Sequence, residues 1–218
     1  MLSHFIDIQL QAKDDRSSQF ARLLSRLHGF KSKNSGHLIA VDFPEWQMAG
    51  PFMTSQAGNV LRVLGRQESL SAFMSKTGLL ELLIEGGFTI TGVREVPESP
   101  TGYVQVKRNY KISRYQDLLA SPATIRYDQV EGEPSAAMKD LAVKLGMPVN
   151  LLVSMELIKS KLLEEQRNSV LIKLKSQSTD LRFTAFVMRE PAEPSLSTPN
   201  LSSYGFSVDG SVIPTWLP

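Results

Sequence analysis

The stretch HFIDIQL, residues 4–10, decides the fold expected for the first half of the chain. Its apolar residues alternate with acidic and amide side chains, which is the pattern of a β-strand. An apolar pattern with helical spacing follows, in which Ser17 and Ser18 can cap a helix and Gly29 can close it. The chain is therefore expected to begin with a strand that is followed by a helix.

Further patterns of apolar residues predict the remaining strands and helix of the first half. We predict strands at residues 38–43, 59–64 and 88–96, and a second helix at residues 69–84. The order strand, helix, strand, strand, helix, strand is typical of the ferredoxin-like fold, an antiparallel sheet with two helices on one face. Prolines and a glycine follow the last strand and indicate a boundary. We therefore predict an α+β protein in which residues 1–98 form a ferredoxin-like (RRM-like) domain.

Residues 99–218 are less regular and are expected to form a smaller α+β domain. The patterns predict a strand or extended arm at 103–114, helices at 135–145 and 150–166, strands at 170–175 and 183–188, and a loop at 190–203. The last strands, 204–208 and 211–216, are expected to form a hairpin with a type I′ turn at Asp209-Gly210.

Composition narrows the classes of function. The 218 residues have a formal net charge of only +2, which does not by itself indicate a nucleic-acid partner. The chain has no cysteine, so disulfides, thiolate catalysis and Cys-based zinc sites are excluded. Neither a signal peptide at the start nor an apolar run long enough to span a bilayer is found. We expect a cytoplasmic protein without a membrane partner.

His28 is the first candidate for chemistry, and two interpretations of it are open. It can be a helix C-cap, because a histidine near the last carbonyls of a helix gains from the helix dipole. It can instead be a general base, because its ordinary pKa lies near neutral pH. The histidines, His4, His28 and His37, have no metal-ligand spacing, so we expect no metal site.

Two further segments have the composition of a phosphate or RNA site. Residues 175–179, KSQST, place small hydroxyls after a strand, which suits a phosphate, although an ordinary polar turn has the same composition. Residues 103–114 contain no acid and combine basic with aromatic side chains: Lys107, Arg108, Lys111, Arg114, Tyr103 and Tyr110. Such a mixture suits RNA, although a solvated surface would have the same composition.

In order and spacing, these motifs resemble those of the type I-F CRISPR repeat-processing endoribonucleases. The resemblance is carried by HFIDIQL at the start, LLSRLHGF around His28, LIAVDFPEW at 38–46, YVQVKR at 103–108, LKSQSTDLRF at 174–183, SSYGFS at 202–207 and VIPTWLP at the end. It covers nearly the whole length and is poorest over residues 115–168.

This resemblance implies an enzyme that binds a CRISPR repeat stem-loop and cuts at the base of its 3′ side. A ribose 2′-hydroxyl attacks the adjacent phosphate, leaving a 2′,3′-cyclic phosphate and a 5′-hydroxyl, without a metal or cofactor. The family's general base falls on His28, its ribose-orienting residue on Ser176, and a tyrosine close to the catalytic histidine on Tyr204. The product is expected to remain bound as the 3′ hairpin of a crRNA, beside the other subunits of a type I-F interference complex.

RNA contacts follow from the same resemblance. Ser178 and Thr179 match hydroxyls near the cut, and Phe183 matches an aromatic residue that packs on a nucleotide. Arg108 matches an arginine that reads a guanine, the commonest specific base contact of arginine. We therefore assign RNA binding to Lys107, Arg108, Tyr110, Lys111, Arg114, Ser178, Thr179 and Phe183.

The chain departs from the family pattern at two places. Tyr110 stands where a family example carries a glutamine that reads a base, so a different repeat sequence is expected. The family's arginine-rich helix is reduced to Arg114 within residues 113–120. A weaker or differently built grip on the stem is expected, which suggests a divergent branch of the family.

Three alternatives are open. A CRISPR RNA-binding subunit that no longer cuts is disfavoured because both His28 and Ser176 are present. An unrelated RNA-binding module would need the RNA-recognition motif, which the chain lacks. A metabolic enzyme on the same fold is disfavoured because the chain has no Gly-rich phosphate loop and no clustered carboxylates.

Overall fold

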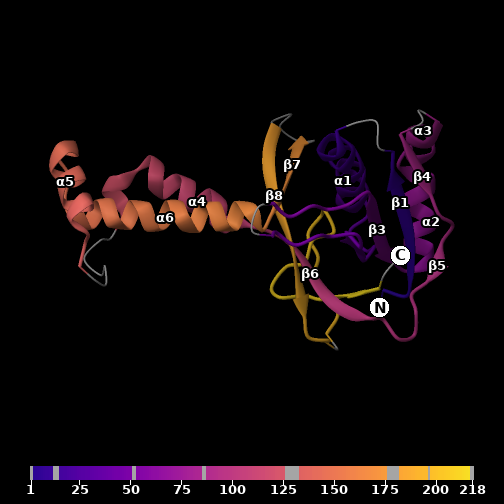
Figure 1. Cartoon of the computed structure of the whole chain (residues 1–218). Coiled ribbons are helices and arrows are strands. Elements are labelled where there is room, and N and C mark those ends of the chain that lie inside the picture. The colour runs from indigo at the N-terminus through magenta and orange to yellow at the C-terminus, as the bar shows by residue number, and fades with distance from the viewer. Residues whose placement is uncertain are drawn as a thin grey trace. The chain divides into compact units, whose positions relative to one another are not determined.

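The computed structural model of the chain describes residues 2–11, 15–50, 53–84, 87–125, 133–175, 182–195 and 197–216 (Figure 1). The described strands form two antiparallel sheets, which together with the helices confirm the expected α+β class. By their contacts the residues group into two compact units. Unit 1 holds residues 1–108 and 169–218, and unit 2 holds residues 109–168.

The first sheet comes entirely from the first half of the chain. Its strands are β1 (His4–Leu10), β2 (Ile39–Asp42), β3 (Val60–Gly65) and β4 (Phe88–Ile90), in the order β2-β3-β1-β4, with β5 (Arg94–Glu95) also paired to β1. All of these pairs are antiparallel. The helices between them are α1 (Arg16–Lys33), α2 (Gln67–Lys76) and α3 (Leu79–Ile84).

The second sheet comes from the other half. Its strands are β6 (Gly102–Arg108), β7 (Val170–Lys175), β8 (Arg182–Ala192) and β9 (Ile213–Thr215), in the order β7-β8-β6-β9. One hydrophobic core contains residues of both sheets and of α1. The sheets thus separate near the boundary expected at residue 98, whereas contacts join both of them in unit 1.

Several predicted elements of the first half have different ends. Helix α1 begins after Asp15, whose carboxylate accepts a 3.1 Å hydrogen bond from the Ser17 amide, and it continues through Gly29 to Lys33. The helix expected at 69–84 is two helices, because the chain turns at Gly78 with a φ of +63°. The strand expected at 88–96 is interrupted after β4, where the Thr91 hydroxyl accepts a hydrogen bond from the Asp7 amide.

The hairpin expected at the end of the chain is wrong in its pairing. The turn is present, because Asp209 and Gly210 both have positive φ and the Ser211 amide donates to the Val208 carbonyl at 3.0 Å. However, β9 pairs with β6 and not with residues 204–208. Pairing with β6 buries Ile213 in the core, which favours this arrangement.

Unit 2 is helical within its described residues. It contains α4 (Tyr110–Ala120), the short 3₁₀ helix η1 (Pro122–Thr124), α5 (Ala136–Leu145) and α6 (Val149–Arg167). The cap at Ser135 and the stop at Gly146 confirm the helix expected at 135–145. The arm expected at 103–114 is a strand only to Arg108, because the Asn109 side chain accepts from the Lys111 amide and starts α4.

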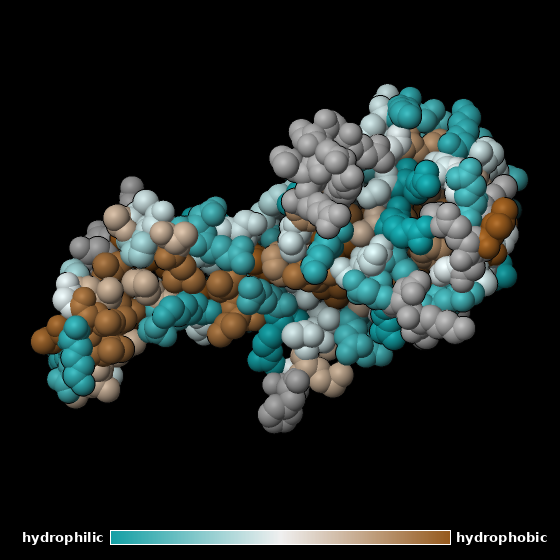
Figure 2. All heavy atoms as spheres, turned by 90° about the horizontal axis from the view of Figure 1, so that it is seen from above, coloured by the Kyte–Doolittle hydropathy of each residue, from teal (hydrophilic) through white to brown (hydrophobic). Residues whose placement is uncertain are grey.

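Unit 2 exposes several large apolar side chains. Figure 2 shows brown, hydrophobic side chains gathered over this helical unit, and the exposed ones include Val143, Leu157 and Leu163. In the described residues, no single helix is long and apolar enough to cross a membrane, although α5 and α6 would meet that test as a bent pair. Glu165 joins α6 to α4 through Lys111 at 2.6 Å and Asn109 at 2.7 Å.

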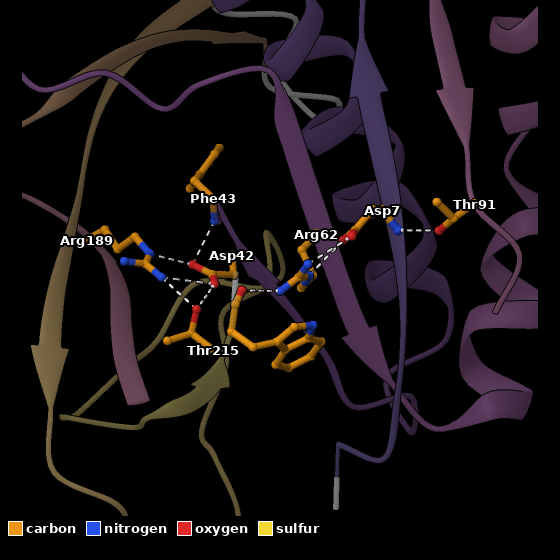
Figure 3. A network of polar contacts seen from close by, with 8 residues as sticks. Asp7, Asp42, Phe43, Arg62, Thr91, Arg189 and Thr215 are labelled. Carbon is orange, nitrogen blue, oxygen red and sulfur yellow. Dashed lines mark hydrogen bonds and ion pairs between the residues drawn. The ribbon is translucent and has the colours of Figure 1, made fainter. Parts of the chain in front are cut away.

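A buried arginine links the first sheet to the last residues of the chain (Figure 3). The Arg62 guanidinium donates to both carboxylate oxygens of Asp7, at 2.8 and 2.9 Å, and to the carbonyl of Trp216 at 2.8 Å. It also lies 4.2 Å from the ring centroid of Trp216 and 4.9 Å from that of Phe5. Because Arg62 is fully buried, its charge has lost its hydration, and these partners compensate for that loss.

A second buried charge joins the two sheets directly. The carboxylate of Asp42, at the end of β2, accepts from the guanidinium of Arg189 in β8, with the shorter bond 2.7 Å long. It also accepts from the hydroxyl of Thr215 in β9 at 2.8 Å and from the Phe43 amide at 2.7 Å. Three strands of two sheets therefore converge on one carboxylate (Figure 3).

We expect Asp42→Ala to lower the free energy of unfolding by about 3–5 kcal/mol, because it leaves Arg189 as an uncompensated, largely buried charge. Urea unfolding measures this change. Glu68→Ala is the control, since the exposed pair of Glu68 with Arg66 should contribute less than about 1 kcal/mol. Equal losses in the two variants would show that Asp42 does not hold the sheets together.

Candidate active site

His28 lies in α1, next to a residue of the hydrophobic core. The neighbouring Leu27 is fully buried, whereas the His28 ring is half-buried. The helix continues for five more residues and is capped by Asn34, so His28 is not in its last turn. The helix C-cap interpretation of His28 is therefore wrong, because the carbonyls that such a cap would serve belong to later residues.

The ring of Tyr204 stacks on the imidazole of His28. The ring centroids are 4.4 Å apart, and the planes are inclined by only 9°. Tyr204 also lies near Phe206, at 6.2 Å, and meets the edge of Phe183 at 6.4 Å. Residues that are far apart in the sequence thus form one aromatic group beside the candidate base.

A glycine turn brings Tyr204 to this position. Gly205 has a φ of +78°, which favours glycine, and its carbonyl accepts from the Val41 amide at 3.1 Å. A Cβ at Gly205 would lie only 3.1 Å from side-chain atoms of both Leu27 and Val41. The turn can therefore approach α1 and β2 closely only with glycine at this position.

Arg108 completes the group of side chains. It is the last residue of β6, and its guanidinium carbon lies 5.3 Å from the centroid of the Phe183 ring. Burial raises the pKa of Tyr204, and the nearby charge of Arg108 opposes this rise in part. The structure therefore brings together His28, Tyr204, Phe183 and Arg108, all of which the sequence had singled out.

The environment of His28 favours its neutral form. Burial lowers the pKa of His28 below its usual 6.5, so the unprotonated imidazole predominates at neutral pH. Its Nδ1 atom is buried and has no hydrogen-bond partner among the described residues. A neutral imidazole can accept a proton from a hydroxyl group that is held beside it.

Part of the predicted site lies outside the described residues. Ser176, Ser178 and Thr179 fall in the segment 176–181, and their assigned roles stay predictions. This segment connects β7 to β8, which pair up to Lys175 and Arg182.

The remaining predicted RNA contacts are distributed over both units. In unit 1, Lys107 forms a 2.6 Å ion pair with Glu190. In unit 2, Lys111 is bound to Glu165, while Tyr110 and Arg114 line an open groove on α4 together with Asp117. Their roles in RNA binding stay predictions. No group of His, Asp or Glu side chains suited to a metal ion occurs among the residues described.

Two residues that shape the site were not singled out from the sequence. Gly205 could have been found from SSYGFS, because a glycine in a serine-rich stretch indicates a turn or loop. Lys31 could not, because its hydrogen-bond acceptors include the carbonyl of Ser202, 171 residues later in the chain.

The fold and the site are those of an α+β protein in which a neutral imidazole is stacked on an aromatic ring that itself lies near a cation. A family model described as CRISPR-associated protein (Cas_Csy4) matches residues 5–216. The chain therefore belongs to this family of CRISPR-associated proteins, which confirms the resemblance at that level. The assignment to type I-F stays a prediction.

No curated protein matches the chain. Similar solved structures include the CRISPR endoribonuclease Cse3 bound to a 19-nt RNA, with 10% identity, a TM-score of 0.34, and coverage of 98% of this chain and 99% of that chain. Another is Thermus thermophilus Cse3 bound to an RNA representing a pre-cleavage complex, with 9% identity, a TM-score of 0.32 and coverage of 98% of each chain. TM-scores this low support no conclusion about the function of the chain.

We expect Tyr204→Ala to raise the pKa of His28 towards 6.5, because the change exposes the imidazole to water. NMR titration of the His28 ring protons measures this pKa. Tyr110→Ala, which removes an exposed ring in unit 2, is the matched control. An unchanged titration midpoint in Tyr204→Ala would mean that the stacked ring does not set the environment of His28.

Proposed function

We propose that this protein is an endoribonuclease that cuts CRISPR repeat RNA without a metal ion, with His28 as the general base. The observation that carries this proposal is the stacking of Tyr204, which lies near the charge of Arg108, on a half-buried, neutral His28. Membership of the Cas_Csy4 family supports the CRISPR RNA as substrate.

The proposed reaction begins at a ribose 2′-hydroxyl. His28 takes its proton, and the 2′-oxygen attacks the adjacent phosphorus while the bond from phosphorus to the 5′-oxygen breaks. The leaving 5′-oxygen takes up a proton from the solvent, to which His28 returns the one it accepted, and the products are a 2′,3′-cyclic phosphate and a 5′-hydroxyl. A base positioned in this way accelerates such a step by about 10²–10⁴-fold.

The other residues of the group hold the substrate in this proposal. The Tyr204 ring fixes the plane of the imidazole, and the Phe183 ring offers a surface on which a nucleobase can stack. Arg108, whose guanidinium lies over the Phe183 ring, is proposed to read a guanine. Ser176 is proposed, from the family resemblance, to orient the ribose.

The wider assignment follows the same resemblance. We propose that the RNA partner is the 3′ stem-loop of a crRNA and that the product stays bound within a type I-F interference complex in the cytoplasm. Acidic partners of Lys107 and Lys111 support a weaker grip on the stem than an arginine-rich helix would give.

We also propose that residues 1–98 form a ferredoxin-like domain. The chain order β1-α1-β2-β3-α2-α3-β4, in which two short helices take the place of the second helix, supports this. The sheet order β2-β3-β1-β4 with antiparallel neighbours also supports it. In this assignment, α1 is the first helix of the domain and carries the base. The remaining residues, 99–218, are proposed to form the RNA-binding domain.

His28→Ala should abolish cutting and leave RNA binding nearly intact, because a general base acts on the reacting proton and contributes little to ground-state affinity. Single-turnover cleavage with saturating enzyme and a parallel binding titration measure the two effects. His37→Ala is the control, since the His37 imidazole is engaged elsewhere, by the Ser69 hydroxyl at 2.9 Å. Cutting by folded His28→Ala within about threefold of the wild-type rate would exclude His28 as the base.

Cleavage of a repeat RNA should proceed in EDTA at the rate found with Mg²⁺ and should leave a cyclic phosphate, because the 2′-hydroxyl is the nucleophile in the proposed reaction. Mapping of the product ends, with and without phosphatase treatment of the 3′ end, distinguishes the possible products. A 3′-hydroxyl product, or loss of cutting in EDTA, would contradict the proposed chemistry.

A further inference from the structure

Lys31 follows His28 by three residues on α1, so the two side chains lie on the same side of the helix. Its ammonium donates to the carbonyl of Ser202 at 2.7 Å, to that of Ile39 at 3.2 Å and more weakly to that of Leu201 at 3.5 Å. One side chain thus joins α1, the first residue of β2 and the turn that carries Tyr204.

The turn held by Lys31 is short and tightly closed. The Ser202 amide donates to the Phe206 carbonyl at 2.8 Å, and the Gly205 amide donates to the Ser202 carbonyl at 2.9 Å. The Ser202 hydroxyl also accepts from the Phe206 amide at 3.1 Å. A shift of Ser202 therefore moves the whole turn, including Tyr204.

The position of Lys31 is an unusual one for a charge. Its side chain is half-buried, and none of the described carboxylates forms an ion pair with it. Burial lowers the pKa of Lys31 to about 8. Partial burial costs Lys31 free energy of desolvation, which an exposed lysine such as Lys33 on the same helix does not lose. The hydrogen bonds from Lys31 to the three carbonyls must offset this cost.

We propose that Lys31 is a positioning residue, whose ammonium holds the turn of residues 201–206 against α1 and so keeps Tyr204 stacked on His28. Its effect on cleavage rests on the proposed function, in which His28 is the base. Its effect on the stack does not, because the stack exists without RNA. The two parts can therefore be tested separately.

The test compares Lys31→Met, which keeps the length of the side chain and removes the donors, with Lys33→Met as the matched control on the same helix. NMR of the free protein reports the pKa of His28 and the ring-current shifts between His28 and Tyr204. In Lys31→Met, the pKa of His28 should rise towards 6.5 and the ring-current shifts should shrink. Lys33→Met should resemble the wild type in both, and an unchanged stack in Lys31→Met would overturn the proposal.

Cleavage supplies the second readout. At saturating enzyme, Lys31→Met should cut at least about tenfold more slowly, with RNA affinity within about threefold of wild type, because orientation is lost and not binding. In the Tyr204→Ala background, Lys31→Met should cause no further loss, since Lys31 acts through Tyr204. An equal loss in both backgrounds would overturn the proposal.

Folding and the identity of the base are controlled separately. If Lys31→Met does not fold, Lys31→Gln, which keeps two N–H donors on a shorter side chain, takes its place, and smaller changes in the same direction are expected. Failure of both to fold would overturn the proposal in favour of a purely structural role. If His28→Ala still cuts, the proposed base fails, while the NMR result on Lys31 and the stack stands independently.

Discussion

The carboxylate of Asp42 is the point at which the two sheets are joined, and the geometry of the site depends on it. It sits at the end of β2 and binds Arg189 of β8 and Thr215 of β9. The neighbouring strand β3 carries Arg62, which donates a hydrogen bond to the carbonyl of Trp216. The strand that ends in Arg108 pairs with both β8 and β9, so these contacts also fix its position against the first sheet.

Burying these charges costs free energy of desolvation, whereas packing apolar side chains does not. A buried ion pair stabilises a fold only when its partners are complete, and it penalises arrangements in which one partner is absent. Asp42 and Arg62 each have several hydrogen-bond partners from distant segments. They therefore select one way of placing the second sheet against the first, which apolar side chains could pack in several ways.

Local patterns predicted much of this fold, and their failures have physical reasons. The alternation in HFIDIQL predicts β1, whose bounds are those expected. The hairpin at the end was mispaired because a partner strand more than a hundred residues earlier competes for β9. Helix α4 was missed because basic and aromatic side chains do not distinguish a strand from a helix, and its only fully buried residue is Ile112. The stack of Tyr204 on His28 could be expected only through the family resemblance, because 176 residues separate the two in the sequence.

The turn at Gly205 also determines when the site can exist. Helix α1 leaves the ribosome long before residues 201–206, so the nascent protein carries His28 without Tyr204 for most of its synthesis. Until that turn closes, the imidazole is more exposed to water and its plane is not fixed. Closing the long loop between them also costs conformational entropy, which the contacts of the turn must offset. The stacked imidazole therefore exists only once residues 201–206 have been made, and a chain that has not reached them lacks this arrangement.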